Sequence, residues 1–187
     1  AYGLKAQIHL VMEDLTAAEQ AVRKALSKVE EPRQNGTRLL LSVLLKQERY
    51  VEARPILEDA ALRWSDVKAF WQQLTAVYYE VDEEKLAFVT QQIMHRQKML
   101  TTSKELSSVA QLYLYHDIPI KAASVLQAGL DDGRIEKTEK NYELLAQAYM
   151  HAREWNKAIS PLTAAADKSD KGRFYEQLGQ SYLQDEK

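Results

Sequence analysis

The sequence predicts an all-α protein, a right-handed α-solenoid of about eleven helices, and three observations lead to this prediction. The 187 residues include only 6 glycines and 4 prolines, and this scarcity of chain breakers favours helices over sandwiches or barrels. The segment 139–171 carries two apolar stripes at helical spacing, separated by a polar break at 151–154. The same pattern recurs along the chain at a nearly constant interval.

The two stripes of segment 139–171 predict a helical hairpin. The first stripe occupies positions i, i+3, i+4 and i+7, which share one face of a helix, and the second is narrower. The stripes consist of Tyr142, Leu145, Ala146 and Tyr149, and then of Ala158, Leu162 and Ala165. Two such helices joined by a tight turn cannot bury their apolar faces alone, so neighbouring copies are required.

Two columns of residues establish the repeat. The small residue that opens the second stripe recurs at intervals of 35, 34, 35 and 36 residues, at Ala18, Ala53, Ala87, Ala122 and Ala158. The residue that closes the first stripe recurs at intervals of 35, 34, 35, 36 and 33 residues, at His9, Leu44, Tyr78, Tyr113, Tyr149 and Tyr182. Two independent columns with one period are difficult to obtain by chance. The small column lets two helix backbones approach closely, and the large residues fill the space between repeats.

The period and the residue pattern resemble the tetratricopeptide repeat (TPR), which has an aromatic residue, Leu-Gly and Tyr on its first helix and Ala, a large residue and Ala on its second. The best match is Tyr175-x-x-Leu178-Gly179-x-x-Tyr182. The predicted repeats span 1–33, 34–67, 68–102, 103–138 and 139–171, with a half repeat at 172–187. No linker divides them, so a single TPR superhelix over 1–187 is expected, and its ends fall within the pattern of a longer chain.

The third repeat departs from the pattern. Gln91 and Met94 occupy positions where an apolar and a small residue are expected, so its second helix is expected to be rotated or longer. Leu86, Val89 and Ile93 would then be used differently from their counterparts.

Several residues predict the ends and bends of helices. Ser103 and Thr138 are candidate N-caps. Pro119 suits the first turn of a helix, whereas Pro55 and Pro161 fall inside second helices, where they can introduce a kink.

The sequence offers no constellation for catalysis, a metal or a cofactor. There is no cysteine, and the four histidines form no His-Glu-x-x-His motif. His116 and Asp117 are adjacent but fall at a turn between two helices, where a solvated role is expected. The net charge is −2 and the basic residues are scattered, so nucleic-acid binding is disfavoured. No apolar run is long enough to span a membrane.

The remaining candidate is a groove for a peptide or protein. In such arrays the first helices line the inner surface, and their outward positions form columns. An apolar column flanked by amide side chains suits an extended peptide or a helix, with Tyr79 and Tyr115 as the expected hot spots. The alternative is that the apolar column packs on the neighbouring first helix. The candidate residues are Arg38, Ser42, Leu45, Gln72, Tyr79, Gln111, Leu114, Tyr115, Glu143, Gln147, Met150 and His151.

The residues in these columns also disfavour partners with an acidic C-terminus. TPR proteins that grip acidic chaperone C-termini resemble one another in a clamp of lysine and asparagine on the first helices. The matching positions here include Arg38, Gln72 and Glu143, and the last would repel a terminal carboxylate.

One segment resembles a narrower group. It includes the runs Met99–Thr102, Leu112–Leu126, Ala152–Glu154, Ser160–Ala166 and Leu178–Gln180. These runs, over roughly residues 95 to 187, resemble periplasmic TPR proteins encoded beside TonB-type energy-transduction components in marine gammaproteobacteria. The resemblance implies a non-enzymatic periplasmic accessory of a TonB-type complex that supports uptake of iron complexes. The alternatives are an interaction segment of a larger enzyme or envelope-assembly protein, a cytoplasmic location, and self-association through exposed terminal helices.

Overall fold

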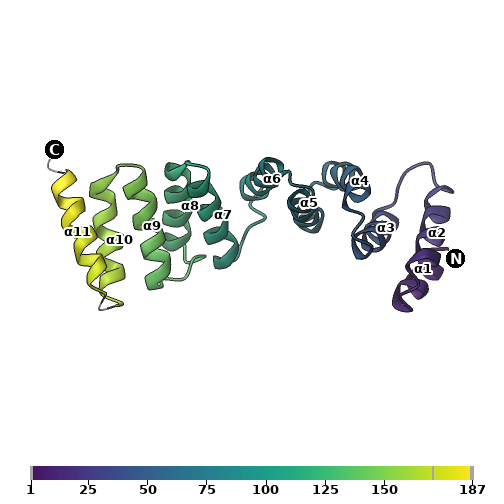
Figure 1. Cartoon of the computed structure of the whole chain (residues 1–187), viewed down its shortest axis with the longest axis horizontal. Coiled ribbons are helices and arrows are strands. Elements are labelled where there is room, and N and C mark those ends of the chain that lie inside the picture. Colours follow the sequence, from purple (N-terminus) through teal and green to yellow (C-terminus); the bar gives the residue numbers. More distant parts are fainter. Residues whose placement is uncertain (1, 170, 186–187) are drawn as a thin grey trace. The chain divides into compact units, whose positions relative to one another are not determined.

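A computed structural model describes residues 2–169 and 171–185 of the chain. These residues form eleven α-helices and no strand, which confirms the predicted all-α helical-repeat fold (Figure 1). The helices are α1 (Tyr2–Val11), α2 (Leu15–Leu26), α3 (Gln34–Lys46), α4 (Tyr50–Arg63), α5 (Lys68–Glu80), α6 (Glu84–Arg96), α7 (Ser103–Tyr115), α8 (Pro119–Asp131), α9 (Glu139–His151), α10 (Trp155–Ala166) and α11 (Gly172–Asp185). Odd-numbered helices carry the first stripe of each repeat, and even-numbered helices carry the second.

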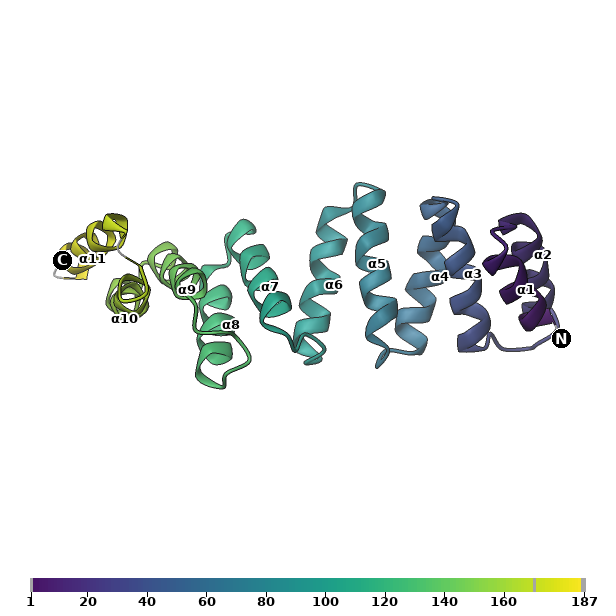
Figure 2. The same ribbon diagram turned by 90° about the horizontal axis from the view of Figure 1, so that it is seen from below.

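The chain divides into two compact units, Ala1–Met94 and His95–Lys187. The first unit contains α1 to α5 and nearly all of α6, and the second contains α7 to α11. Figure 2 shows α3 to α6 side by side within the first unit. Figure 1 shows α7 to α11 side by side in the second. Within each unit, consecutive helices form hairpins that bury their apolar stripes against each other.

The close-contact column is buried as the sequence predicts. All five alanines are inaccessible to solvent: Ala18, Ala53, Ala87, Ala122 and Ala158. Large residues fill the space around them, and complete burial of a leucine such as Leu57 or Leu162 contributes about 2 kcal/mol to stability. In the second unit, Leu162 and Phe174 belong to one core cluster, against which Tyr142 and Tyr149 pack.

The aromatic residues of α11 are an exception. Tyr175 and Tyr182 fit the first-stripe signature best, yet both are more than half exposed. Phe174 is fully buried against α10 instead. In the complete repeats the first-stripe face is covered by the following even-numbered helix, and no helix follows α11 in the described part of the chain.

Each turn from an odd-numbered helix to the next even-numbered helix has the same geometry. One residue adopts a left-handed conformation with φ between 55° and 59°, and the amide after it donates to a carbonyl five residues earlier at 2.8 to 3.0 Å. These two features define the Schellman motif, which usually has glycine at the left-handed position. Here the left-handed residues are Glu13, Glu48, Asp82, Asp117 and Arg153. Each lies five residues before the alanine of the close-contact column.

One predicted N-cap is confirmed and the other is wrong by one residue. Thr138 caps α9, since its hydroxyl accepts from the Asn141 amide at 3.2 Å. Ser103 is the first residue of α7, and Thr102 is the cap. Glu105 completes a capping box with Thr102, because its carboxylate accepts from the Thr102 amide at 3.2 Å. The serine hydroxyl is free to accept from an inter-repeat loop amide, that of Glu136.

The prolines lie where the sequence places them. Pro119 occupies the first turn of α8, where its missing amide costs no hydrogen bond. Pro55 and Pro161 lie inside α4 and α10.

The third repeat shows how α6 accommodates its unusual residues. The helix has 13 residues, as α8 has, so it is not longer. Met94 is buried at the place of the expected small residue, and Gln91 is partly exposed. Leu86 and Val89 remain 40% and 45% exposed.

Candidate partner-binding surfaces

The twelve predicted groove residues all lie on odd-numbered helices, and none of them is buried. They divide between the two units, and each set is described by itself. The first unit holds Arg38, Ser42 and Leu45 on α3, with Gln72 and Tyr79 on α5. The second holds Gln111, Leu114 and Tyr115 on α7, with Glu143, Gln147, Met150 and His151 on α9.

Among the predicted groove residues of the first unit, Tyr79 is the exposed aromatic side chain. It is 44% exposed, and the partial burial of its ring raises the pKa of its hydroxyl. The Arg38 guanidinium lies 5.4 Å from the centre of the Phe70 ring, which holds this charge against an apolar surface. The Ser42 hydroxyl donates to the Arg38 carbonyl at 2.9 Å, so it is used within α3.

In the second unit, Tyr115 is the corresponding side chain. It is 75% exposed and meets His116 edge to face, with ring centres 5.1 Å apart. Met150, by contrast, packs on the core cluster around Leu162. The alternative reading of the apolar column, that it packs within the array, therefore describes Met150 better than Tyr115.

Glu143 differs from the expectation in its electrostatics. The Arg173 guanidinium on α11 lies 2.7 Å from the Glu143 carboxylate. Lys171 pairs in the same way with Glu139. The negative charge of Glu143 is therefore compensated, so its repulsion of an acidic C-terminal partner is weaker than the sequence predicts.

A second candidate surface, which the sequence reasoning did not predict, lies on α4, α5 and α6. It is a cleft of about 170 Å³. Trp71, Leu74 and Tyr78 of α5 contribute to its lining together with residues of the two even-numbered helices. The contributions of α4 and α6 are Glu58, Ala61, Leu62, Leu86, Val89, Thr90 and Ile93. Glu58 is the one charged residue in this lining, so the cleft is predominantly apolar.

The polar atoms of the cleft have partners within the unit. The Tyr78 hydroxyl donates to the Glu58 carboxylate at 2.9 Å, and burial together with this hydrogen bond raises the pKa of Tyr78 to about 12. The Trp71 indole N–H donates to the Ser65 carbonyl at 2.9 Å. Thr90 shares a 2.7 Å hydrogen bond with a buried threonine of α5. With these groups satisfied, the surface offered to a ligand is that of rings and aliphatic side chains.

A signal for this cleft was present in the sequence. Leu86, Val89 and Ile93 occupy positions i, i+3 and i+7, which form one stripe along α6. The stripe belongs to the repeat that departs from the pattern, but its exposure depends on how α6 packs against its neighbours.

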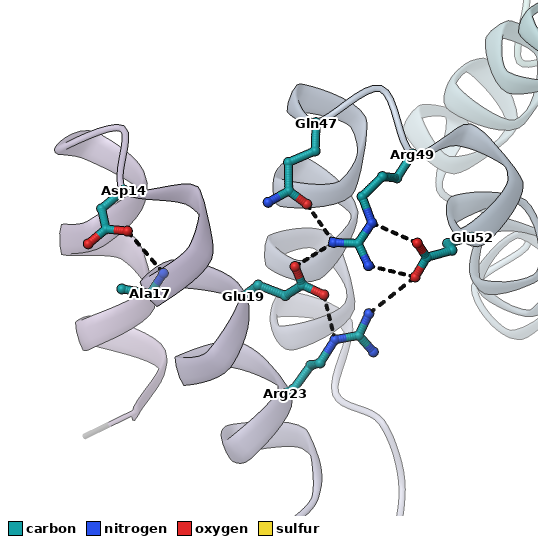
Figure 3. A network of polar contacts seen from close by, with 7 residues as sticks. All are labelled: Asp14, Ala17, Glu19, Arg23, Gln47, Arg49 and Glu52. Carbon is teal, nitrogen blue, oxygen red and sulfur yellow. Dashed lines mark hydrogen bonds and ion pairs between the residues drawn. The ribbon is translucent and has the colours of Figure 1, made fainter.

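A polar network connects α2 with the beginning of α4 (Figure 3). Arg49 lies between Glu19 and Glu52 and also donates to Gln47, while Arg23 donates to Glu19 at 2.8 Å. Arg49 lowers the pKa of Glu52 through a hydrogen bond. For Glu19 burial opposes ionisation, but hydrogen bonds from the two arginines outweigh it and lower the pKa. Opposite charges thus compensate one another, and the network serves to hold neighbouring repeats together.

Neither a metal site nor a membrane span is found in the described residues. Residues 2–169 and 171–185 contain no group of three or more His, Cys, Asp or Glu side chains placed to hold a metal ion. No helix among them combines the length and apolar character required to cross a bilayer.

No family model matches the sequence, and no curated protein matches it. Solved structures do resemble it. A tetratricopeptide repeat protein from Parabacteroides merdae aligns over 98% of this chain and 72% of its own, with 16% identity and a TM-score of 0.60. The MamA protein aligns over 94% and 93%, with 15% identity and a TM-score of 0.58. YrrB, described as a TPR protein with an unusual peptide-binding site, aligns over 96% and 90%, with 16% identity and a TM-score of 0.58. The fold of this chain is therefore that of tetratricopeptide-repeat proteins.

Proposed function

We propose that this chain is a non-catalytic scaffold that binds a protein or peptide through its odd-numbered helices. The observation that carries the proposal is the exposure of large amphipathic side chains, Tyr79 and Tyr115, on helices whose other faces are committed to packing. Such side chains bury a ring in an interface while the hydroxyl retains a hydrogen-bond partner. The peptide-binding site ascribed to YrrB supports this use of the fold.

Amide side chains also lie on the odd-numbered helices of each unit. Gln72 lies on α5, and Gln111 and Gln147 lie on α7 and α9. Each amide offers both donors and an acceptor, so it can pair with the exposed backbone of an extended peptide. Apolar anchors would supply most of the affinity, and the amides would fix the register of the peptide.

The test is the double variant Tyr79→Ala and Tyr115→Ala. Loss of two hot-spot tyrosines weakens partner binding by about 2 kcal/mol or more, roughly thirtyfold in Kd. Because the rings are largely outside the core, the thermal midpoint is expected to stay within a few degrees of the parent. Val51→Ala, at an exposed site on α4, is the matched control. A large fall in the midpoint would show that the tyrosines are core residues and would remove the basis of the proposal.

We propose further that the partner is a component of a TonB-type complex and that the chain acts in the periplasm. The resemblance of residues 95 to 187 to periplasmic TPR proteins of TonB-type systems supports this proposal. The tagged chain, expressed in its native host, should be released with the periplasmic fraction. It should also recover a TonB-type component from envelope extracts, and less of it with the double tyrosine variant. Recovery of the chain in the cytoplasmic fraction, or of cytoplasmic partners alone, would contradict this assignment.

A further inference from the structure

The cleft on α4, α5 and α6 is apolar at two positions where the fourth and fifth repeats are polar. Leu86 and Val89 stand one residue before and two residues after the close-contact Ala87. The corresponding residues of the fourth and fifth repeats are Lys121 and Ser124, and Lys157 and Ser160. All four of these side chains are exposed. The repeat fold thus accepts lysine and serine at these positions, so packing does not require the apolar residues of the third repeat.

The second unit provides an internal comparison. Between α8 and α10, over α9, lies a hollow at the equivalent place in the repeat. Its lining includes the polar side chains of Ser124, Gln127, Asp131, Glu154 and Lys157. The second-unit hollow therefore combines these polar and charged side chains with apolar ones such as Ile120 and Tyr149, whereas Glu58 is the one charged residue that lines the first-unit cleft.

The size of the apolar cleft limits what can enter it. Its volume of about 170 Å³ is close to the ~150 Å³ of an engineered apolar cavity that binds benzene. One aromatic ring or one branched aliphatic side chain therefore fills it. Leu62, Leu86 and Val89, which belong to its lining, remain 75%, 40% and 45% exposed, so they offer apolar surface to further apolar residues of the same ligand.

The charges at one end of the cleft are mainly acidic. The turn from α5 to α6 has the sequence Glu-Val-Asp-Glu-Glu over 80–84, and its four carboxylates are exposed. Glu83 approaches Arg54 to 4.0 Å, and Arg54 also approaches Glu58 of the cleft, so the turn lies beside this end. Arg54 and Lys85 compensate only part of this negative charge. A ligand with a basic group here gains electrostatic attraction, whereas an acidic one is repelled.

We propose that this surface docks an amphipathic helix of a partner protein, which places one large apolar side chain in the cleft and a lysine or arginine beside residues 80–84. The helix lies along α4 and α6, with apolar residues at i, i+3 or i+4, and i+7, and with its polar face toward solvent. This surface is separate from the odd-numbered helix columns and goes beyond the function proposed for them.

The probe is a fluorescein-labelled synthetic peptide of about 14 residues, with leucines at i, i+3, i+4 and i+7 and two lysines at one end. Fluorescence anisotropy measures its Kd for the whole chain, and amide chemical-shift changes locate it. Binding should perturb amides of α4, α5 and α6. The variant Leu86→Lys with Val89→Ser should weaken binding at least tenfold, or about 1.4 kcal/mol. It introduces the residues of two other repeats, so the circular dichroism midpoint should be preserved.

Controls separate the apolar and the charged contributions. Val51→Ser alters a residue of α4 that is 73% exposed but outside the cleft, and it should leave Kd unchanged. Glu83→Gln with Glu84→Gln should weaken binding several-fold at low salt and much less at high salt. A peptide with glutamine in place of lysine should not distinguish this variant from the parent.

Three results would overturn the proposal. The first is equal peptide affinity for the parent and the Leu86→Lys, Val89→Ser variant, and the second is a set of shifted amides outside α4 to α6. The third is a combination of two observations: the peptide does not bind, and light scattering shows a concentration-dependent dimer that the same variant abolishes. That combination would assign the cleft to a second copy of this chain. The variant Tyr79→Ala with Tyr115→Ala should bind the peptide as tightly as the parent, because the cleft is a separate surface from the one that carries these tyrosines.

Discussion

Gly129 lies in α8 at a position where the second and fifth repeats have alanine, and its missing side chain makes room for Ile135. A Cβ atom at Gly129 would lie 2.6 Å from Cδ1 and Cγ1 of Ile135 and 3.3 Å from its Cβ. Rotation of the isoleucine side chain can move Cγ1 and Cδ1 but not Cβ. The backbone is also held, because the Ile135 amide donates to the Gly129 carbonyl at 2.7 Å. Gly129→Ala therefore forces a shift in a buried contact.

The expected change in stability is the difference between two terms. Alanine is better than glycine in a helix by about 0.8–1.0 kcal/mol, which favours the variant. Overpacking a close-packed site costs typically 1–3 kcal/mol, which opposes it. Since Ile135 is almost fully buried and held by the backbone, we expect the second term to dominate, with a net loss of about 1–2 kcal/mol. For a chain of this size the thermal midpoint should fall by about 2–8 °C.

Urea unfolding of four proteins, the parent, Gly129→Ala, Ile135→Ala and the double variant, tests this reasoning. Ile135→Ala alone should cost about 2–5 kcal/mol because it leaves a cavity. In that background Gly129→Ala should become stabilising by up to about 1 kcal/mol, which gives a coupling of roughly 2 kcal/mol. Gly179→Ala is the control, because a Cβ there meets no atom within 4 Å and should stabilise α11. A Gly129→Ala variant more stable than the parent would refute the reasoning.

Two further predictions concern polar contacts of the first unit. Arg49→Gln removes the hydrogen bonds that lower the pKa of Glu19 and Glu52. A carboxylate whose pKa is lower in the folded protein stabilises the fold at pH values above its pKa in the unfolded chain, about 4.3, and this stability is lost as pH falls through the folded pKa. The variant should therefore lose less stability than the parent between about pH 5 and pH 3 in urea titrations. An unchanged dependence of the unfolding free energy on pH would contradict this role. Thr75→Val or Thr90→Val alone should cost about 1 kcal/mol by calorimetry, because each removes the 2.7 Å hydrogen bond between the two buried hydroxyls and leaves the remaining hydroxyl with its backbone carbonyl alone. The double variant should cost less than the sum of the single variants, and additive losses would show that the pair is not coupled.

The helical repeat could be predicted because it follows from the periodic spacing of apolar and small residues along the chain. The exposed binding surfaces could not, because they depend on which helix covers which face. The alanine column has one period and one environment, so its burial follows from sequence alone. Leu86 is as apolar as a core leucine, and its exposure follows only from the packing of α6. Glu143 is paired with Arg173, which lies 30 residues away, so no local pattern reveals the pair. The error at Ser103 has a simpler cause, since Thr102 is an equally good cap beside it.

The left-handed turn residues have a consequence for how such a chain can change during evolution. Each turn is closed by the same backbone hydrogen bond, and the position that most proteins reserve for glycine accepts glutamate, aspartate or arginine here. A whole hairpin can therefore be duplicated or exchanged as a unit without a new turn having to be selected. The charge of the residue in each turn can then vary from one repeat to the next, at little cost to the contact of the alanine that lies five residues further on.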